Sequence, residues 1–256
     1  MMMGFFANNI LPAHLGEFIR MYLGAKVLQV KNSQVLATII LERIFDILVT
    51  VWFLTFALIF IPKLPLIFTQ IGIFAGAIGL LLVPLLVVSM AWGKFILKGV
   101  RKLLFLCPKT LAEKMTQQIN LGISGFQAIK SPALLSGIVF TSVLQWLLMG
   151  ICIYCSLLAV GIHEHYSVAI LVLCCMVFAV TIPSAPGFFG VFQVAYLISL
   201  SPFGVKDDSA LAASIFFHTL TFSSVTLLGF YLMHFMGMNI HKLQRVSGHA
   251  DEEFNS

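Results

Sequence analysis

An apolar run at positions 35–61 is long enough to cross a membrane, yet it contains three charged side chains. Glu42, Arg43 and Asp46 lie within five positions of one another. A charge at the bilayer centre costs at least about 2.5 kcal/mol per residue, even on the lenient insertion scale. Three charges so placed cannot all face lipid. Because Asp46 is four residues from Glu42 and three from Arg43, each pair shares a helix face. We therefore expect the trio to face the protein interior or a water-filled cavity.

The composition is that of a polytopic membrane protein. Of the 256 residues 60% are hydrophobic and only 10% are charged, whereas soluble domains carry about 25% charged residues. The mean hydropathy is +1.02. Six apolar segments can be read, of which the fourth and fifth are short: 35–61, 66–90, 132–160, 166–182, 188–201 and 209–236. We predict an all-α integral membrane bundle with about six spanning or half-spanning segments.

A helix-breaking sequence separates the two short segments. It reads Pro183-Ser-Ala-Pro186-Gly187-Phe-Phe-Gly190, with two prolines and two glycines in eight residues. A break at membrane depth is tolerated only where the backbone is buried in protein or lines a cavity. Short helices around such a break are typical of transporter binding sites. Two interpretations stay open: a tight turn, and a re-entrant hairpin whose backbone N–H groups face a lipid head group.

The first 34 residues contain a second break. The apolar stretch 1–11 is interrupted by Asn8-Asn9 and Pro12. A helix is expected from about position 14 to 29, but Glu17 and Arg20 make it too polar to span a membrane. We expect it to lie at an interface or to re-enter the membrane.

The segment 91–131 is strongly basic, with seven Lys or Arg residues and one acidic residue. Its apolar residues recur at spacings of three or four, which predicts amphipathic helices. Such a linker is typical of an interfacial element facing anionic lipid, although a plain positive-inside loop fits equally well. The positive-inside rule then puts this linker and the C-terminal tail in the cytoplasm. We predict one multi-pass domain over 1–240 in the plasma membrane of the cell, followed by a short polar tail at 241–256.

Other chemistries have little support. The net charge of +5 is concentrated in the linker, so it does not indicate nucleic-acid binding. Cys152-x-x-Cys155 lies in an apolar run without turn residues, and His163-Glu164-His165 lies in a short loop. Neither has the further ligands that a metal site requires. We expect no cofactor, no metal and no disulfide framework.

Three motifs occur in order along the chain. They are Asn9-x-Leu-Pro12-x-His-x-Gly16-Glu17-x-x-Arg20, then Glu42-Arg43-x-x-Asp46, then Pro183-x-x-Pro186-Gly187-x-x-Gly190-x-x-Gln193. Their order and spacing resemble the lysylphosphatidylglycerol synthase transmembrane region, also called the flippase-like domain family. The resemblance covers nearly the whole chain.

The chain departs from the family pattern at several points. His14 stands where Arg is common, Gln193 where Glu is usual, and His218 lies in a helix where the family often has an Arg. We hypothesise that the changes at 193 and 218 are coupled, because an acid and a base would both be replaced by neutral polar groups. Without a partner of that kind, His218 is expected to be hydrogen-bonded in the core. The resemblance also implies that the chain is N-terminally short and lacks the soluble domain that transfers aminoacyl groups.

The resemblance implies the lipid-translocating or scaffold half of such proteins. We expect the two broken segments, 8–17 and 183–190, to meet inside the membrane and form a polar cavity. Arg20 and Arg43 would hold a lipid phosphate. The acidic residues would hold an ammonium group or balance the arginines. The candidate lining residues are Asn9, Pro12, Gly16, Glu17, Arg20, Glu42, Arg43, Asp46, Pro183, Pro186, Gly187, Gly190, Gln193 and His218.

Several alternatives stay open. The charged residues could form a purely structural ion cluster or a proton relay. The chain could serve as a scaffold for a separate lipid-modifying or glycosyl-transferring enzyme. It could also be a transferase acting on a polyprenyl phosphate, with Glu17 and Asp46 as the acid and base. The expected partners are membrane lipids, anionic or aminoacylated phospholipids above all.

Overall fold

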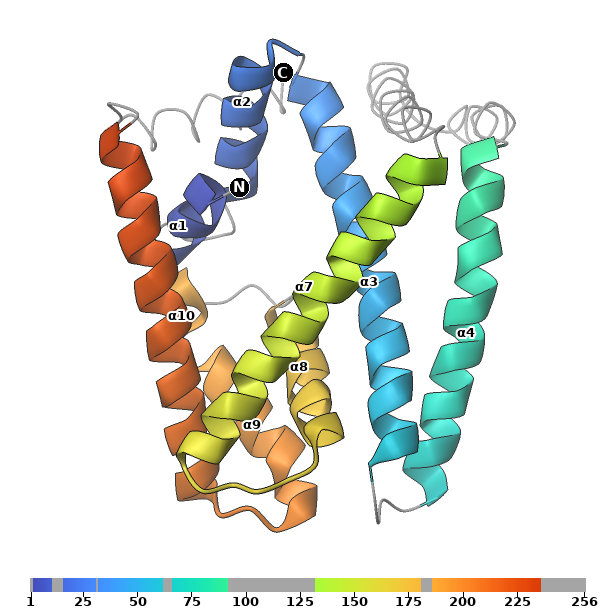
Figure 1. Cartoon of the computed structure of the whole chain (residues 1–256), viewed down its shortest axis with the longest axis vertical. Coiled ribbons are helices and arrows are strands. Elements are labelled where there is room, and N and C mark those ends of the chain that lie inside the picture. The colour runs from blue at the N-terminus through green and yellow to red at the C-terminus, as the bar shows by residue number, and fades with distance from the viewer. Residues whose placement is uncertain are drawn as a thin grey trace, which may run out of the picture.

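The computed structural model of the chain describes residues 2–10, 16–30, 32–61, 66–91, 132–180 and 186–235 (Figure 1). In this part of the chain every regular element is helical, which confirms the all-α prediction. The elements are α1 (Met2–Ile10), α2 (Gly16–Leu28), α3 (Asn32–Phe60), α4 (Leu66–Ala91), α7 (Pro132–Ala159), α8 (Tyr166–Val180), η2 (Pro186–Phe188), α9 (Val191–Leu200), η3 (Ser201–Phe203) and α10 (Asp207–Phe235). The linker predicted at 91–131 lies outside the described residues except for its first residue, which ends α4; the tail, Pro12 and Pro183 also lie outside them.

The predicted apolar segments coincide with α3, α4, α7, α8, α9 and α10. In the described part of the chain four stretches are long and apolar enough to cross a membrane: 34–60, 136–159, 186–203 and 207–235. The third of these is not one helix but η2, α9 and η3 in succession, with non-helical backbone at Gly187. By themselves α8, with 15 residues, and α9, with 10, are about 22 Å and 15 Å long, too short to span the hydrocarbon core. The chain is therefore a multi-pass membrane protein in which long helices frame shorter ones.

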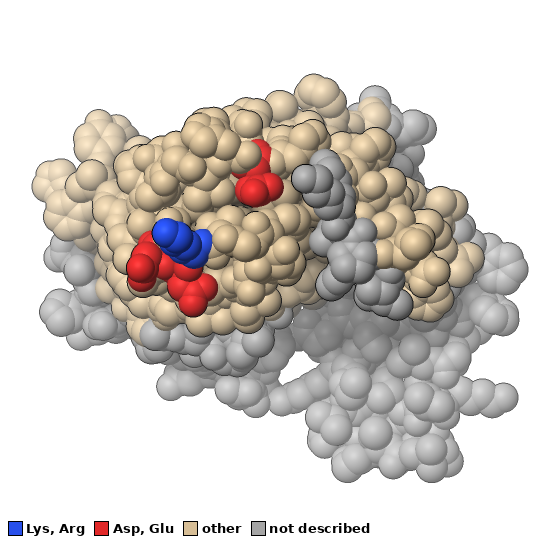
Figure 2. Space-filling model, turned by 90° about the horizontal axis from the view of Figure 1, so that it is seen from below, with Lys and Arg blue, Asp and Glu red and all other residues tan. Residues whose placement is uncertain are grey.

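The molecule has two distinct ends. At the end that we call the linker end, α4 stops and α7 begins; α2 and α10 also finish there (Figure 1). At the opposite end, the loop end, lie the connections 161–165 and 204–206. Figure 2 shows that the described part of the loop end is mostly uncharged surface. Its charged side chains come from Glu164, Lys206, Asp207 and Asp208.

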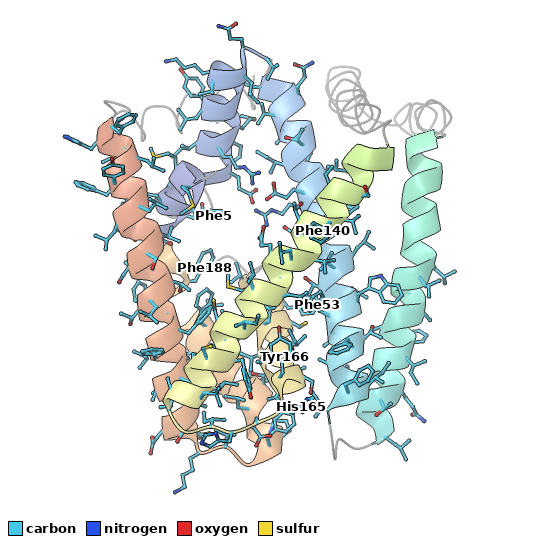
Figure 3. The ribbon with its side chains drawn as sticks, viewed as in Figure 1. Phe5, Phe53, Phe140, His165, Tyr166 and Phe188 are labelled. Atoms are coloured by element: carbon cyan, nitrogen blue, oxygen red, sulfur yellow. The ribbon has the colours of Figure 1, made fainter. Side chains whose placement is uncertain are left out.

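Two pairs of short helices enter the fold from opposite ends. The pair α1 and α2 lies toward the linker end, whereas α8 and α9 lie toward the loop end (Figure 1). The two pairs meet, because α1 packs against η2, the turn that precedes α9. In Figure 3 Phe5 of α1 and Phe188 of η2 mark this meeting region between the two ends. The structure shows this contact between α1 and η2. That the segments 8–17 and 183–190 form a polar cavity inside the membrane stays a prediction.

Left-handed backbone shapes the turn between α8 and α9. Gly187 has φ +70°, Phe188 +60° and Gly190 +85°. Glycine adopts this region without strain, whereas a bulky side chain such as that of Phe188 does not. A Cβ atom at Gly187 would also lie 2.8 Å from the Phe222 ring of α10. The two glycines of the third motif therefore have a backbone role.

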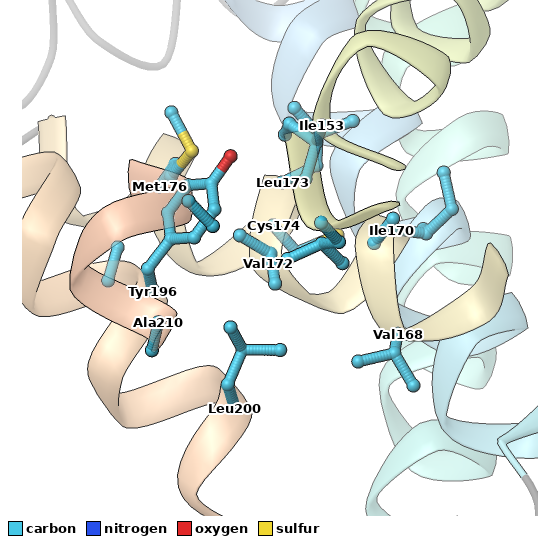
Figure 4. Close-up of a cluster of buried hydrophobic side chains, with 14 of the residues drawn as sticks. Ile153, Val168, Ile170, Val172, Leu173, Cys174, Met176, Tyr196, Leu200 and Ala210 are labelled. Atoms are coloured by element: carbon cyan, nitrogen blue, oxygen red, sulfur yellow. The ribbon is translucent and has the colours of Figure 1, made fainter. Parts of the chain in front are cut away.

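The main core surrounds α8, whose faces pack against α3, α7 and α9 (Figure 4). Tyr196 of α9 is fully buried there, and its hydroxyl lies 3.0 Å from Ser156 Oγ of α7. A buried phenol needs such a partner. A smaller cluster joins Met3 and Phe6 of α1 to Ile19 of α2 and Met233 of α10. These two cores hold the short helix pairs against the long helices.

Candidate functional site

Arg20 of α2 and Glu42 of α3 form a two-pronged ion pair. Nη1 of Arg20 donates to Oε1 of Glu42 at 2.9 Å, and Nη2 donates to Oε2. Parallel N–H···O bonds of this kind fix direction as well as charge. The Arg20 side chain is only 14% exposed. Arg20 thus supplies the second cation that the acidic residues of α3 require, and the pair ties α2 to α3.

Arg43 connects two more acids. Its Nη2 lies 2.9 Å from Oε1 of Glu17 on α2, and its Nη1 donates to Oδ2 of Asp46 at 3.3 Å. Asp46 also accepts a 3.3 Å hydrogen bond from Nε1 of Trp146 on α7. Elements that are 100 residues apart in sequence therefore meet at Asp46.

We call Glu17, Arg20, Glu42, Arg43 and Asp46 the charged cluster. Its three carboxylates and two guanidinium groups sum to one negative charge when all are ionised. The Arg43 side chain is 46% exposed and that of Glu17 40%. Glu42 lies about 15 Å along α3 from its first residue, in a helix long enough to cross a hydrocarbon core about 30 Å thick. The cluster is thus a partly exposed polar group on and beside a candidate membrane span.

The asparagine pair of the first motif ties α1 to its neighbours. Asn8 Oδ1 accepts a 2.8 Å hydrogen bond from the backbone N–H of Gly16, the first residue of α2. Asn9 Nδ2 donates to Thr226 Oγ1 of α10 at 3.1 Å. A Cβ atom at Gly16 would lie 2.0 Å from the carbonyl oxygen of Gly4. Gly16 therefore lets α1 and α2 pack closely, and the asparagines hold this packing against α10.

A second polar group joins the turn before α9 to α10. The backbone N–H of Gly190 donates to Oε1 of Gln193 at 2.9 Å. Nε2 of Gln193 lies 3.3 Å from Nδ1 of His218, whose Nε2 lies 2.8 Å from the carbonyl oxygen of Gly187. We call these four residues the amide–histidine clasp.

The chemistry of the partners fixes the direction of each bond in the clasp. The Gly187 carbonyl can only accept, so His218 Nε2 carries a hydrogen and donates. Gln193 uses its oxygen for Gly190, so its NH₂ group donates to His218 Nδ1. Each of these atoms is satisfied with a neutral imidazole. The rings of Phe189, Phe192 and Phe222 surround His218, with centroids 4.7 Å, 4.8 Å and 6.1 Å away.

The structure thus sorts the predicted site residues into groups. The charged cluster lies on α2 and α3, and the clasp lies on η2, α9 and α10. His218 is hydrogen-bonded in the core, as predicted, and Gln193 is its partner. Asn9 and Gly16 serve the packing of α1, and Pro186 opens the η2 turn.

Sequence reasoning missed Asn8, Trp146 and Thr226 as partners. A signal existed for Trp146, because an indole N–H in an apolar helix needs an acceptor. Two other patterns have ordinary roles. His165 Nδ1 lies 2.8 Å from Ser167 Oγ at the start of α8, and Cys152 and Cys155 are free thiols. In the described residues no three His, Cys, Asp or Glu side chains gather as a metal site would need.

Two relatives named as membrane proteins are similar to the chain over most of its length. It is 25% identical over 238 residues to a UPF0104 membrane protein of Methanothermobacter thermautotrophicus, which covers 88% of this chain and 70% of the relative. It is 24% identical over 245 residues to a UPF0104 membrane protein of Methanocaldococcus jannaschii, which covers 93% of this chain and 97% of the relative. No solved structure is significantly similar to it. The family model described as the lysylphosphatidylglycerol synthase TM region matches residues 1–229, so the chain belongs to this family.

Proposed function

We propose that this protein moves a phospholipid, or a related phosphate-bearing lipid, between the two leaflets of the membrane. The observation that carries the proposal is the charged cluster: five acidic and basic side chains on α2 and on the candidate span α3, two of which are at least 40% exposed. Charges inside a bilayer are costly, and exposed ones are found where they face a polar pathway. The chain's family takes its name from the membrane region of a lipid-modifying synthase, which fits a lipid as the cargo.

Arg43 is the residue best placed to receive a phosphate. Its guanidinium is held by Glu17 at 2.9 Å and by Asp46 at a longer 3.3 Å, and it is the more exposed of the two arginines. An incoming phosphate would replace one carboxylate as the partner of Arg43, since a guanidinium binds both groups with similar geometry. This exchange keeps the arginine paired throughout.

The displaced carboxylate then needs a cation. Lipids with an ammonium group supply one. A single head group would then provide the phosphate for Arg43 and the ammonium for the displaced carboxylate. Arg20 is less exposed and keeps both guanidinium nitrogens on Glu42, so it holds α2 against α3 during the exchange. The acyl chains would stay in the surrounding lipid. With the basic linker in the cytoplasm, as its charge predicts, the linker end would face the cytoplasm.

The test is lipid translocation in proteoliposomes. The purified protein is placed in vesicles that contain a fluorescent phosphatidylethanolamine, and a membrane-impermeant quencher reports the fraction that has crossed. We expect Arg43→Ala to lower the initial rate at least tenfold, while the protein inserts and keeps its helical content. Lys206→Ala, at the loop end, is the matched control and should keep the parent rate. Equal translocation rates for Arg43→Ala and the parent would contradict the assignment of Arg43 as the residue that binds the phosphate.

A further inference from the structure

The same order of elements occurs twice in the chain. In the first unit, α2 is followed by Gln29 with φ +54° and then by α3. In the second unit, α9 and η3 are followed by Gly204 with φ +69° and then by α10. Both long helices have 29 residues, and each begins three positions after the left-handed residue, at Asn32 and at Asp207.

The polar residues recur in the same register. Arg43 and His218 each stand fourteen positions after the left-handed residue of their unit. Each is bonded to a residue in the first turn of the short helix: Arg43 to Glu17 in α2, and His218 to Gln193 in α9. The two units therefore share a contact as well as an order, although the residue types differ.

The units run in opposite directions. In Figure 1 α2 runs toward the linker end and α3 returns to the loop end, whereas α9 runs toward the loop end and α10 returns to the linker end. The elements that precede the two units, α1 and η2, pack against each other. Units of inverted direction with broken helices at the midplane are the architecture of transporters that open to each side in turn.

The Arg43–Glu17 contact and the His218–Gln193 contact differ in exposure and in charge. Arg43 in the first unit is 46% exposed, whereas His218 in the second is 4% exposed and surrounded by aromatic rings. The clasp has no ion pair among the described residues and is held by three hydrogen bonds. It ends on a turn where Phe188 has φ +60°, a strained value for a bulky residue. Because both partners of this contact are neutral, it separates without leaving an unpaired charge.

We propose that α2–α3 and α9–α10 are inverted units and that the amide–histidine clasp is the gate of the second unit. In the described structure the gate is closed and the charged cluster is accessible. Opening separates Gln193 on α9 from His218 on α10 and exposes the α10 surface beyond His218 to the loop end. The purpose of the gate rests on the proposed function, but its opening is measured without any lipid movement.

The test uses a cysteine reporter beyond the gate. Thr221 lies one turn after His218 on α10, and its hydroxyl bonds only to carbonyls of its own helix. In a Thr221→Cys protein, reaction with a membrane-impermeant maleimide is read at position 221 by mass spectrometry, so the native cysteines stay in place. Proteoliposomes are sorted by a C-terminal tag into those with the linker end outward and those with the loop end outward.

Gln193→Leu removes the clasp bonds to Gly190 and His218 at nearly constant volume. We expect it to raise labelling of the reporter at least tenfold in loop-end-out vesicles, with less than a twofold change in linker-end-out vesicles. Ser156→Ala is the matched control, because it deletes the hydrogen bond to Tyr196, also on α9, but leaves the clasp intact. A second reporter, Ser199→Cys, is buried in the core of α9 and detects general loosening.

The proposal is overturned if Gln193→Leu leaves labelling within twofold of the parent, or if Ser156→Ala or the Ser199→Cys reporter shows an equal rise. Translocation of fluorescent phosphatidylethanolamine is measured in the same vesicles. Side-specific labelling without any translocation would contradict the proposed function and leave the gate standing. Translocation that depends on Arg43, without side-specific labelling, would contradict the gate alone.

Discussion

His218 of α10 holds the carbonyl oxygen of Gly187 at 2.8 Å from its Nε2, so one imidazole fixes the turn between α8 and α9 to the last long helix. The other ring nitrogen is occupied by Gln193 at 3.3 Å. The neutral pair Gln193 and His218 joins the turn to α10, as an ion pair could, without the cost of burying charge in a membrane.

This contact predicts a compensating pair of substitutions. Gln193→Glu keeps the acceptor for Gly190 N–H but loses the donor to His218 and introduces a negative charge at a half-buried position. We expect the single change to lower the thermal unfolding temperature markedly in detergent. Adding His218→Arg supplies a cation at the same contact and should restore most of the loss. A double variant no more stable than Gln193→Glu would show that the two positions are not coupled.

Substitutions of the Arg20–Glu42 pair test whether it has a structural role or a role in lipid translocation. Glu42→Gln removes the carboxylate that both guanidinium nitrogens of Arg20 bond, and because the pair is part-buried we expect a cost of about 1.5–3 kcal/mol. Replacing both residues by Met removes both charges, so we expect stability near that of the parent. Thermal unfolding and lipid translocation are measured on the same three proteins.

The double Met variant decides between the two roles. If the charged cluster takes part in translocation, this variant is stable but slow. If this pair is only a structural lock, the variant is stable and translocates at the parent rate. The second result would confine the proposed exchange to Glu17, Arg43 and Asp46.

Because α1 and α2 approach closely at Gly16, a side chain at this position is predicted to lower the stability of the protein strongly. A Cβ atom at Gly16 would lie 2.0 Å from the Gly4 carbonyl and 2.5 Å from Asn8 Oδ1, so the backbones must separate. We expect Gly16→Ala to cost about 3 kcal/mol or more, measured as lost thermal stability and lower yield of folded protein. Gly137→Ala in α7 is the matched control, since a Cβ atom there would have nothing within 4 Å of it among the described residues. Equal stability of the two variants would contradict this packing.

The helices could be predicted from sequence because their signal is local. The apolar runs predicted α3 and α10 to within three residues at each end, and the Gly187 and Gly190 pattern predicted a break before α9. The number of acids on α3 also indicated that a further cation was needed, and Arg20 is that cation.

The partners could not be predicted in the same way. Asp46 and Trp146 are 100 residues apart, and no periodic pattern links them. The pairing of Glu17 with Arg43 rather than with Arg20 depends on how α2 is rotated against α3, which side-chain packing decides. Gly16 reads as a member of a binding motif, although its contacts with Gly4 and Asn8 show a packing requirement. Long-range contacts of this kind become visible only once the helices are assembled.

Removing the hydrogen bond from Trp146 to Asp46 is predicted to change the rate of lipid translocation with little change in thermal stability. Trp146→Phe keeps an aromatic ring in α7 but removes the N–H that Asp46 Oδ1 accepts at 3.3 Å. Asp46 is still bonded to Arg43, so the loss of stability should be only about 1 kcal/mol. The freed oxygen, however, lets the carboxylate turn toward Arg43 and compete better with a lipid phosphate. We therefore expect translocation to slow several-fold while thermal stability hardly changes.

Trp52→Phe on α3, where the residue is 40% exposed, is the matched control and should leave the translocation rate unchanged. A parent-like rate for Trp146→Phe would mean that Asp46 does not regulate Arg43, and would limit the site to Arg43 and Glu17.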